Sequence, residues 1–205
     1  FTVLLTIAVE EAGGDALAAA RQTLATARDL RRQHAQHWHS FWAKSQIELA
    51  DSDRNCFESL SLTLAKHPSE TLERMAVRLL AYCLSCTRGL EFTKGISTAD
   101  EPDLWVHSDN GEIQNWIEVG HPETPRLRKA CGRARQVTVY AFAKSTPTWW
   151  RLNSEAINAL PHLQVWQLDW AEVQAAANLI ERTMQLNASI VGGIIWATSL
   201  TLLGY

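Results

Sequence analysis

Short apolar runs and amphipathic segments follow one another along the 205 residues of the chain. Alternating apolar positions predict strands, whereas apolar positions three and four residues apart predict helices. The pattern predicts strands at 2–9, a hairpin over 45–65 with its turn at 51–53, short strands within 90–119, strands at 136–142 and 162–168, and a hairpin over 189–196. It predicts helices at 15–38, 69–84, 125–134, 148–160 and 171–184. This order of elements indicates an α/β fold in which a mixed β-sheet is flanked by helices.

The beginning of the chain differs from the rest. After an apolar strand-like run, Gly13-Gly14 and the N-cap residue Asp15 introduce a helix rich in alanine. We therefore expect residues 1–45 to form an N-terminal extension, a strand plus an Ala-rich helix, and residues 46–205 to form one domain. A chain of this length is long enough to bury a sizeable core.

Cysteine usage and the C-terminal segment bear on where the protein works. Four cysteines in a chain this long do not resemble a disulfide framework, so a reduced, cytoplasmic setting is expected. Cys83 and Cys86 follow an apolar helical run and are expected to be small core residues. Residues 187–205 carry no charge, but Gly192-Gly193 indicates a hairpin turn there, so no membrane span is expected.

Two acidic residues and a cation suggest a chemistry. Asp103 lies on one expected strand, Glu118 on the next, and Lys129 on the helix that follows. Mg²⁺ prefers oxygen ligands and keeps several waters, so two carboxylates and substrate phosphate oxygens complete its shell. A nearby lysine stabilises charge on the phosphoryl group. The pattern favours a phosphodiesterase that uses Mg²⁺ or Mn²⁺, although charged pairs also flank many ordinary strand ends.

Basic residues gather just after these carboxylates. Arg126, Lys129 and Arg133 fall on one face of the expected helix, where they could follow a phosphate backbone. The formal net charge of -3 gives no global attraction to nucleic acid. Because net charge says little about a local patch, nucleic acid remains the expected partner through this basic face. The alternative is that the face is simply solvated.

Several segments of the main body resemble, in order, the YaeQ family of small bacterial proteins. The resemblance rests on Leu90-Glu91-Phe92-Thr93-Lys94-Gly95, Glu101-Pro102-Asp103-Leu104-Trp105, Trp116-Ile117-Glu118, Lys129-Ala130-Cys131 and segments 49–55, 62–71, 73–75, 149–150, 182–184 and 195–196. It covers roughly residues 46–196. Members of that family are similar in fold to the PD-(D/E)xK nucleases, so the resemblance implies a restriction-endonuclease-like fold.

The resemblance also implies roles for individual residues. Asp103 matches the motif Asp that follows a proline, and Glu118 matches the acidic position on the next strand, so both would bind metal. Glu73 stands where related nucleases place a further acidic group and is a third candidate ligand. The motif Lys belongs two residues after Glu118, where this chain has Gly120, so a nuclease requires Lys129 to reach back. The alternative is a catalytically inactive nuclease fold that serves as a binding or regulatory module.

The start of the chain carries a second resemblance. His37-Trp38-His39-Ser40-Phe41-Trp42-Ala43-Lys44-Ser45 resembles the segment that leads from the N-terminal sandwich domain toward the catalytic barrel in fucosidase-like glycoside hydrolases. The resemblance covers roughly residues 1–49 and implies that no glycosidase catalytic carboxylate is retained.

Overall fold

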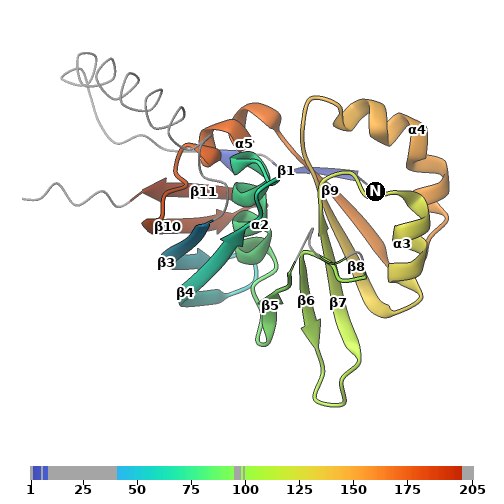
Figure 1. Cartoon of the computed structure of the whole chain (residues 1–205), viewed down its shortest axis with the longest axis horizontal. Coiled ribbons are helices and arrows are strands. Elements are labelled where there is room, and N and C mark those ends of the chain that lie inside the picture. The colour runs from blue at the N-terminus through green and yellow to red at the C-terminus, as the bar shows by residue number, and fades with distance from the viewer. Residues whose placement is uncertain (1, 6, 9–40, 95–97, 99, 200–205) are drawn as a thin grey trace, which may run out of the picture.

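Two mixed β-sheets and the helices around them form a layered α/β structure (Figure 1). The structure is a computed structural model that describes residues 2–5, 7–8, 41–94, 98 and 100–199. The six-stranded sheet has the order β1 (Thr2–Leu5), β9 (Leu163–Leu168), β8 (Ala134–Ala141), β7 (Ile113–Val119), β6 (Leu104–His107) and β5 (Leu90–Phe92). Strands β5, β6 and β7 pair antiparallel, whereas β7, β8, β9 and β1 pair parallel.

The five-stranded sheet has one face toward the core and one toward solvent. Its order is β2 (Ile7–Ala8), β11 (Ile194–Ser199), β10 (Thr183–Val191), β3 (Phe41–Asp51) and β4 (Cys56–Lys66). On β3 the buried residues Ala43, Ile47 and Leu49 alternate with exposed Gln46 and Glu48. This period of two is the pattern of a half-buried strand, because successive side chains point to opposite faces.

Two pairs of helices cover the six-stranded sheet. Helices α2 (Leu72–Leu84) and α5 (Trp170–Ala177) lie between the two sheets, and α3 (Thr124–Cys131) and α4 (Thr146–Asn158) lie on the far face (Figure 1). The larger core cluster joins α2 and α5 to both sheets, and a second cluster joins α3 and α4 to β7, β8 and β9. Cys83 belongs to the larger cluster, as expected, and burial raises the pKa of its thiol to about 12.

The expected mixed sheet flanked by helices is confirmed, with two sheets in place of one. The helix predicted at 171–184 is wrong in its second half, because α5 ends at Ala177 and β10 begins at Thr183. Inward Met184, Leu186 and Ala188 alternate with exposed neighbours there, and this period of two imposes a strand. The single strand predicted at 2–9 is instead two short strands, β1 and β2, one in each sheet. The other described helices and strands match their predicted positions with shifted ends.

Some expectations fall outside what the structure tests. The helix predicted at 15–38 lies outside the described residues. Strand β3 begins at Phe41, and β1 and β2 pair with β9 and β11, one in each sheet. The division at residue 45 stays a prediction. None of the helices in the described part of the chain is long and apolar enough to cross a membrane.

Candidate functional site

Asp103 and Glu118 lie together at one end of β6 and β7. These strands pair antiparallel with Leu104 opposite Ile117, so the same register brings Asp103 opposite Glu118. The Asp103 amide donates to the Ile117 carbonyl oxygen at 2.9 Å, which fixes this corner. Both residues are buried, with 2% and 4% of the whole residue exposed, and both line one pocket of about 250 Å³. The structure therefore brings the two predicted acidic residues to one site.

Both oxygens of Asp103 are bound by the protein. The Arg74 guanidinium donates from Nη2 to Oδ1 at 2.6 Å, and the Val119 backbone N–H donates to Oδ2 at 2.8 Å. Nε of Arg78 lies 3.8 Å from Oδ1. Asp103 is thus held in one orientation by a strand amide on one side and by α2 on the other.

The arginines that hold Asp103 share a second buried carboxylate. Glu70 accepts from Arg74 Nη1 at 3.0 Å and from Arg78 Nη1 at 3.1 Å. The three residues are four apart in sequence, which places them on one side of α2 and the turn before it. Burial acts to lower the pKa of Arg74, but the carboxylates of Asp103 and Glu70 outweigh it and raise that pKa. Arg74 therefore stays charged at the pocket wall.

Glu118 is held by a neighbouring indole and by α3. Its Oε1 accepts from Trp116 Nε1 and from Arg126 Nε, both at 2.7 Å, and Arg126 Nη2 also donates to the Glu101 carbonyl oxygen. No donor among the described residues bonds its other oxygen, Oε2. Burial raises the pKa of Glu118 above its ordinary value, although Arg126 and Trp116 oppose the rise.

His121 completes the polar lining of the pocket. Its Nε2 lies 2.8 Å from Thr146 Oγ1, and its ring stacks on Trp149 with centroids 5.0 Å apart and planes at 14°. Burial lowers the pKa of His121, which favours the neutral imidazole. The first turn of α4 therefore fixes this ring in place.

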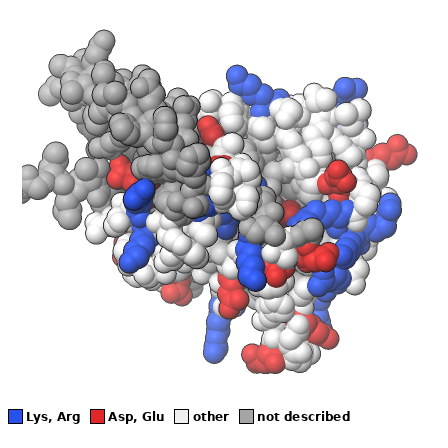
Figure 2. Space-filling view, viewed as in Figure 1, with Lys and Arg blue, Asp and Glu red and all other residues white. Residues whose placement is uncertain are grey.

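The predicted basic face points at protein groups in this structure. Lys129 forms an exposed ion pair with Asp100 at 2.5 Å, and it lowers the pKa of that carboxyl. Arg133 donates to the Asp100 carbonyl oxygen and lies over the Trp116 ring. Figure 2 shows basic and acidic side chains interspersed on the side that carries α3. Of the three predicted basic residues, Arg126 lines the pocket and Lys129 and Arg133 do not.

Glu73 and Gly120 complete the set of predicted site positions. Glu73 lies half-buried in the first turn of α2 and does not line the pocket. Gly120 has a φ of 108°, a conformation that side chains of L-residues rarely adopt. A lysine at position 120 would therefore be strained in this backbone conformation.

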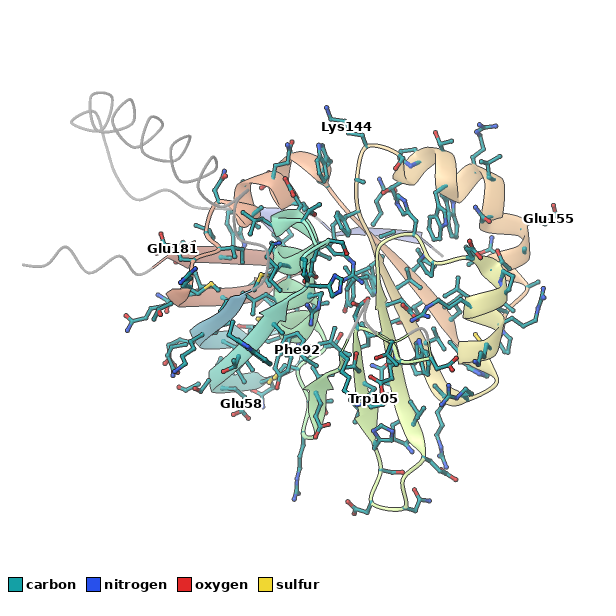
Figure 3. All side chains as sticks on the ribbon, in the orientation of Figure 1. Glu58, Phe92, Trp105, Lys144, Glu155 and Glu181 are labelled. Atoms are coloured by element: carbon teal, nitrogen blue, oxygen red, sulfur yellow. The ribbon has the colours of Figure 1, made fainter. Side chains whose placement is uncertain are left out.

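Sequence reasoning missed the arginines of α2. Arg78 interrupts the apolar run of α2 but is only 4% exposed, and its guanidinium lies 5.4 Å from the centre of the Phe92 ring, which Figure 3 labels. A charged residue inside an otherwise apolar helical run is a signal for a buried partner. That signal, with Glu70 and Arg74 at four-residue spacing, could have predicted a buried charge cluster on this side of α2.

Comparisons with known proteins give consistent results. The family described as "YaeQ protein" matches residues 38–201. The "Uncharacterized protein YaeQ" of Escherichia coli (strain K12) and that of Salmonella typhi are each 40% identical over 154 residues, covering 75% of this chain and 85% of theirs. The crystal structure of the YaeQ protein from Xanthomonas axonopodis pv. citri matches with a TM-score of 0.72 and 39% identity, covering 75% of this chain and 87% of that one.

A second solved structure extends further along the chain. The YaeQ protein from Pseudomonas syringae matches with a TM-score of 0.73 and 31% identity, covering 79% of this chain and 96% of that one. The family match spans well over half of the 205 residues. This chain belongs to the YaeQ family.

Proposed function

We propose that this chain is a nuclease-like phosphodiesterase that acts on nucleic acid with Mg²⁺ or Mn²⁺ at Asp103 and Glu118. The observation that carries the proposal is that these two carboxylates, from neighbouring strands, line one pocket together with Arg74 and Arg126. Carboxylates attract a divalent cation, and guanidinium groups bind phosphate. The resemblance of the family to PD-(D/E)xK nucleases supports the same assignment.

The donor set suits a metal that is shared with substrate. Within the described ranges no group of three His, Cys, Asp or Glu residues could hold a metal ion. Mg²⁺ commonly uses only one or two carboxylates, with waters and phosphate oxygens as its other ligands, so Asp103 and Glu118 are sufficient in number. Oε2 of Glu118 is available, whereas Oδ1 of Asp103 becomes available when Arg74 moves aside. When bound, the ion lowers the pKa of a water and polarises a phosphoryl oxygen.

The chain's own residues supply orientation and charge. The Val119 amide and the Trp116 indole hold Asp103 and Glu118 in fixed positions, which lowers the cost of ordering them when substrate enters. On the α3 side, Arg126 lines the pocket, and Lys129 and Arg133 contact Asp100, the residue before the lining residue Glu101. These three cations would contact successive phosphates. Glu73 stays a candidate for an outer acidic partner on α2.

One observation favours a second function, an inactive binding module. Gly120 replaces the motif lysine, and arginines already neutralise both carboxylates. Carboxylates that are already paired with arginines need no metal ion to balance their charge. In that case the basic side chains of α3 would bind nucleic acid and no turnover would follow.

The test combines metal binding with cleavage. Mg²⁺ and Mn²⁺ are titrated by calorimetry into the wild type and into the double variant Asp103→Asn/Glu118→Gln, and both proteins are incubated with labelled single- and double-stranded DNA and RNA. We expect the wild type to bind metal and to cleave nucleic acid. The double variant should lose metal binding, and its cleavage rate should fall about a hundredfold or more.

A matched control distinguishes the loss of this site from the loss of a carboxylate elsewhere in the protein. Glu112→Gln removes a carboxylate that forms an exposed ion pair with Arg135, away from the pocket, and should leave both readouts unchanged. Metal uptake and cleavage that persist in the double variant would overturn the proposal. Nucleic-acid binding by the wild type with neither metal uptake nor cleavage would establish the binding module in its place.

A further inference from the structure

Two arginines from different helices line the pocket, and each bonds one of the two carboxylates. Arg74 comes from α2 and bonds Asp103 at 2.6 Å, and Arg126 comes from α3 and bonds Glu118 at 2.7 Å. Their side chains are 19% and 30% exposed, so both reach the pocket surface, whereas the carboxylates lie deeper at 2% and 6%. A ligand that enters the pocket therefore meets the guanidinium groups before it meets the carboxylates.

The charges around the pocket are nearly balanced. Three guanidinium groups (Arg74, Arg78 and Arg126) face four carboxylates (Glu70, Glu101, Asp103 and Glu118), of which Glu101 is half-buried. A divalent cation alone would leave this set positive, and a phosphodiester alone would make it more negative. The two together bring it to neutrality, and near-neutral charge matters most where groups are buried.

Phosphate is a ligand that suits two guanidinium groups, each of which is planar. A guanidinium group donates two parallel hydrogen bonds to phosphate oxygens, and the long side chain turns without movement of the backbone. Each arginine that turns to a phosphate leaves its carboxylate free for a cation. We propose that Arg74 and Arg126 form a phosphate-binding subsite, which Asp103 and Glu118 mask until a divalent cation and a phosphodiester enter together. This inference rests on the proposed function and adds the order and coupling of binding.

Arg78 stays close to Asp103 when Arg74 turns away, so Asp103 keeps a positive charge beside it. Nε of Arg78 is buried, has no hydrogen-bond partner in the part of the chain that the structure describes, and lies 3.8 Å from Asp103 Oδ1. Its Nη1 stays anchored on Glu70 and on the Ala65 carbonyl oxygen. Arg78 therefore keeps a positive charge behind Asp103 while Arg74 turns outward.

Linked binding in the wild type is the first test and needs no variant. A short fluorescein-labelled oligonucleotide with phosphorothioate linkages, which resist hydrolysis, is titrated by anisotropy without and with Mn²⁺. Calorimetry measures Mn²⁺ binding without and with the same oligonucleotide. We expect each ligand to raise the affinity of the other about tenfold, and by the same factor, because linkage is reciprocal.

Single arginine variants test the masking directly. Arg74→Gln and Arg126→Gln should each weaken oligonucleotide binding several-fold, yet raise the affinity of the free protein for Mn²⁺, because the freed carboxylate no longer has a competitor. Arg126→Lys keeps the charge without the two-pronged donor and should fall between wild type and Arg126→Gln. Arg135→Gln is the matched control, since Arg135 pairs with Glu112 outside the pocket, and should change neither affinity.

The outcomes separate this inference from the proposed function. Cleavage with Mn²⁺ affinity that is the same with and without oligonucleotide would overturn the subsite and leave the phosphodiesterase standing. Oligonucleotide binding without metal uptake would overturn both and leave a binding module. A loss of Mn²⁺ affinity in Arg74→Gln and Arg126→Gln, in folded protein by circular dichroism, would also contradict masking, because it would assign the arginines a supporting role for the metal.

Discussion

Polar side chains are used in opposite ways by the two sheets. On the five-stranded sheet, Gln46 and Glu48 of β3 point to solvent and bond the hydroxyl groups of Ser61 and Ser59 on β4. At the end of β6 and β7 in the six-stranded sheet, the acidic groups are buried and bonded to arginines of two helices. The first arrangement keeps its polar groups hydrated, whereas the second removes charges from water.

The two arrangements differ in what they cost in stability. Exposed polar groups on a sheet face cost little, because water solvates them in both the folded and the unfolded chain. The desolvation penalty of a buried ion pair often offsets its Coulombic gain, so apolar residues would often be as stable in its place. Stability alone therefore does not explain the charged end of the six-stranded sheet.

The largest expected effect comes from breaking the buried charge set. Arg78→Met removes the guanidinium that bonds Glu70, whose side chain has no exposed surface, and leaves that carboxylate with Arg74 alone. Arg74 then faces two buried carboxylates, Glu70 and Asp103, so one negative charge among the three groups is uncompensated. An uncompensated buried charge typically costs about 3–5 kcal/mol, so we expect the free energy of unfolding to fall by about 4 kcal/mol. Urea denaturation followed by circular dichroism measures the loss.

The compensating change distinguishes charge from packing. In Glu70→Gln/Arg78→Met the carboxylate is removed together with its partner, so the double variant should be more stable than Arg78→Met. If the double variant is less stable than the single one, the loss in Arg78→Met reflects the shape of the side chain, and the comparison between the two sheets fails.

A smaller loss of stability is expected when neighbouring residues on opposite faces of β3 are replaced by alanine. Ile47 is 1% exposed beneath α2 and α5, so Ile47→Ala should lower the free energy of unfolding by about 3 kcal/mol. Gln46 faces solvent, and Gln46→Ala should change it by no more than about 0.5 kcal/mol despite the bond to Ser61. Equal losses in the two variants, measured by the same denaturation, would show that the outer face is covered.

The strands of the five-stranded sheet differ in how far the sequence predicts them. Alternation of apolar and polar positions is enough to predict β3 and β4 as a hairpin, and the two strands pair antiparallel along their whole length. The helix predicted at 171–184 is too long because its helical period runs directly into the alternation of β10, with no proline or glycine between them. Local pattern predicts an element, but tertiary pairing decides where it ends.

The site is predictable in part, for a physical reason. Asp103 and Glu118 can be predicted because antiparallel pairing of adjacent strands brings them together. Arg74 contacts Asp103 from 29 residues away, and this contact depends on where α2 packs, which spacing cannot give. The sequence favours Lys129 as the nearby cation, but α3 begins at Thr124, so Arg126 in its first turn reaches Glu118.

The smallest expected effect is a slope in the pH dependence of stability. Burial raises the pKa of Glu118 above its ordinary value of 4.5, so the folded protein binds this proton more tightly than the unfolded chain. The contribution of Glu118 to the free energy of unfolding therefore falls as pH rises from that ordinary value through the folded-state pKa. Glu118→Gln does not titrate and should lack this fall.

Urea denaturation of both proteins between about pH 4 and pH 7 measures the difference. The wild type should lose stability relative to Glu118→Gln as the pH rises, whereas Glu48→Gln, on the solvated face of β3, should run parallel to the wild type. Parallel profiles for all three proteins would mean that Arg126 and Trp116 fully offset the burial of Glu118. In that case a cation that binds Glu118 gains nothing from the relief of a buried charge.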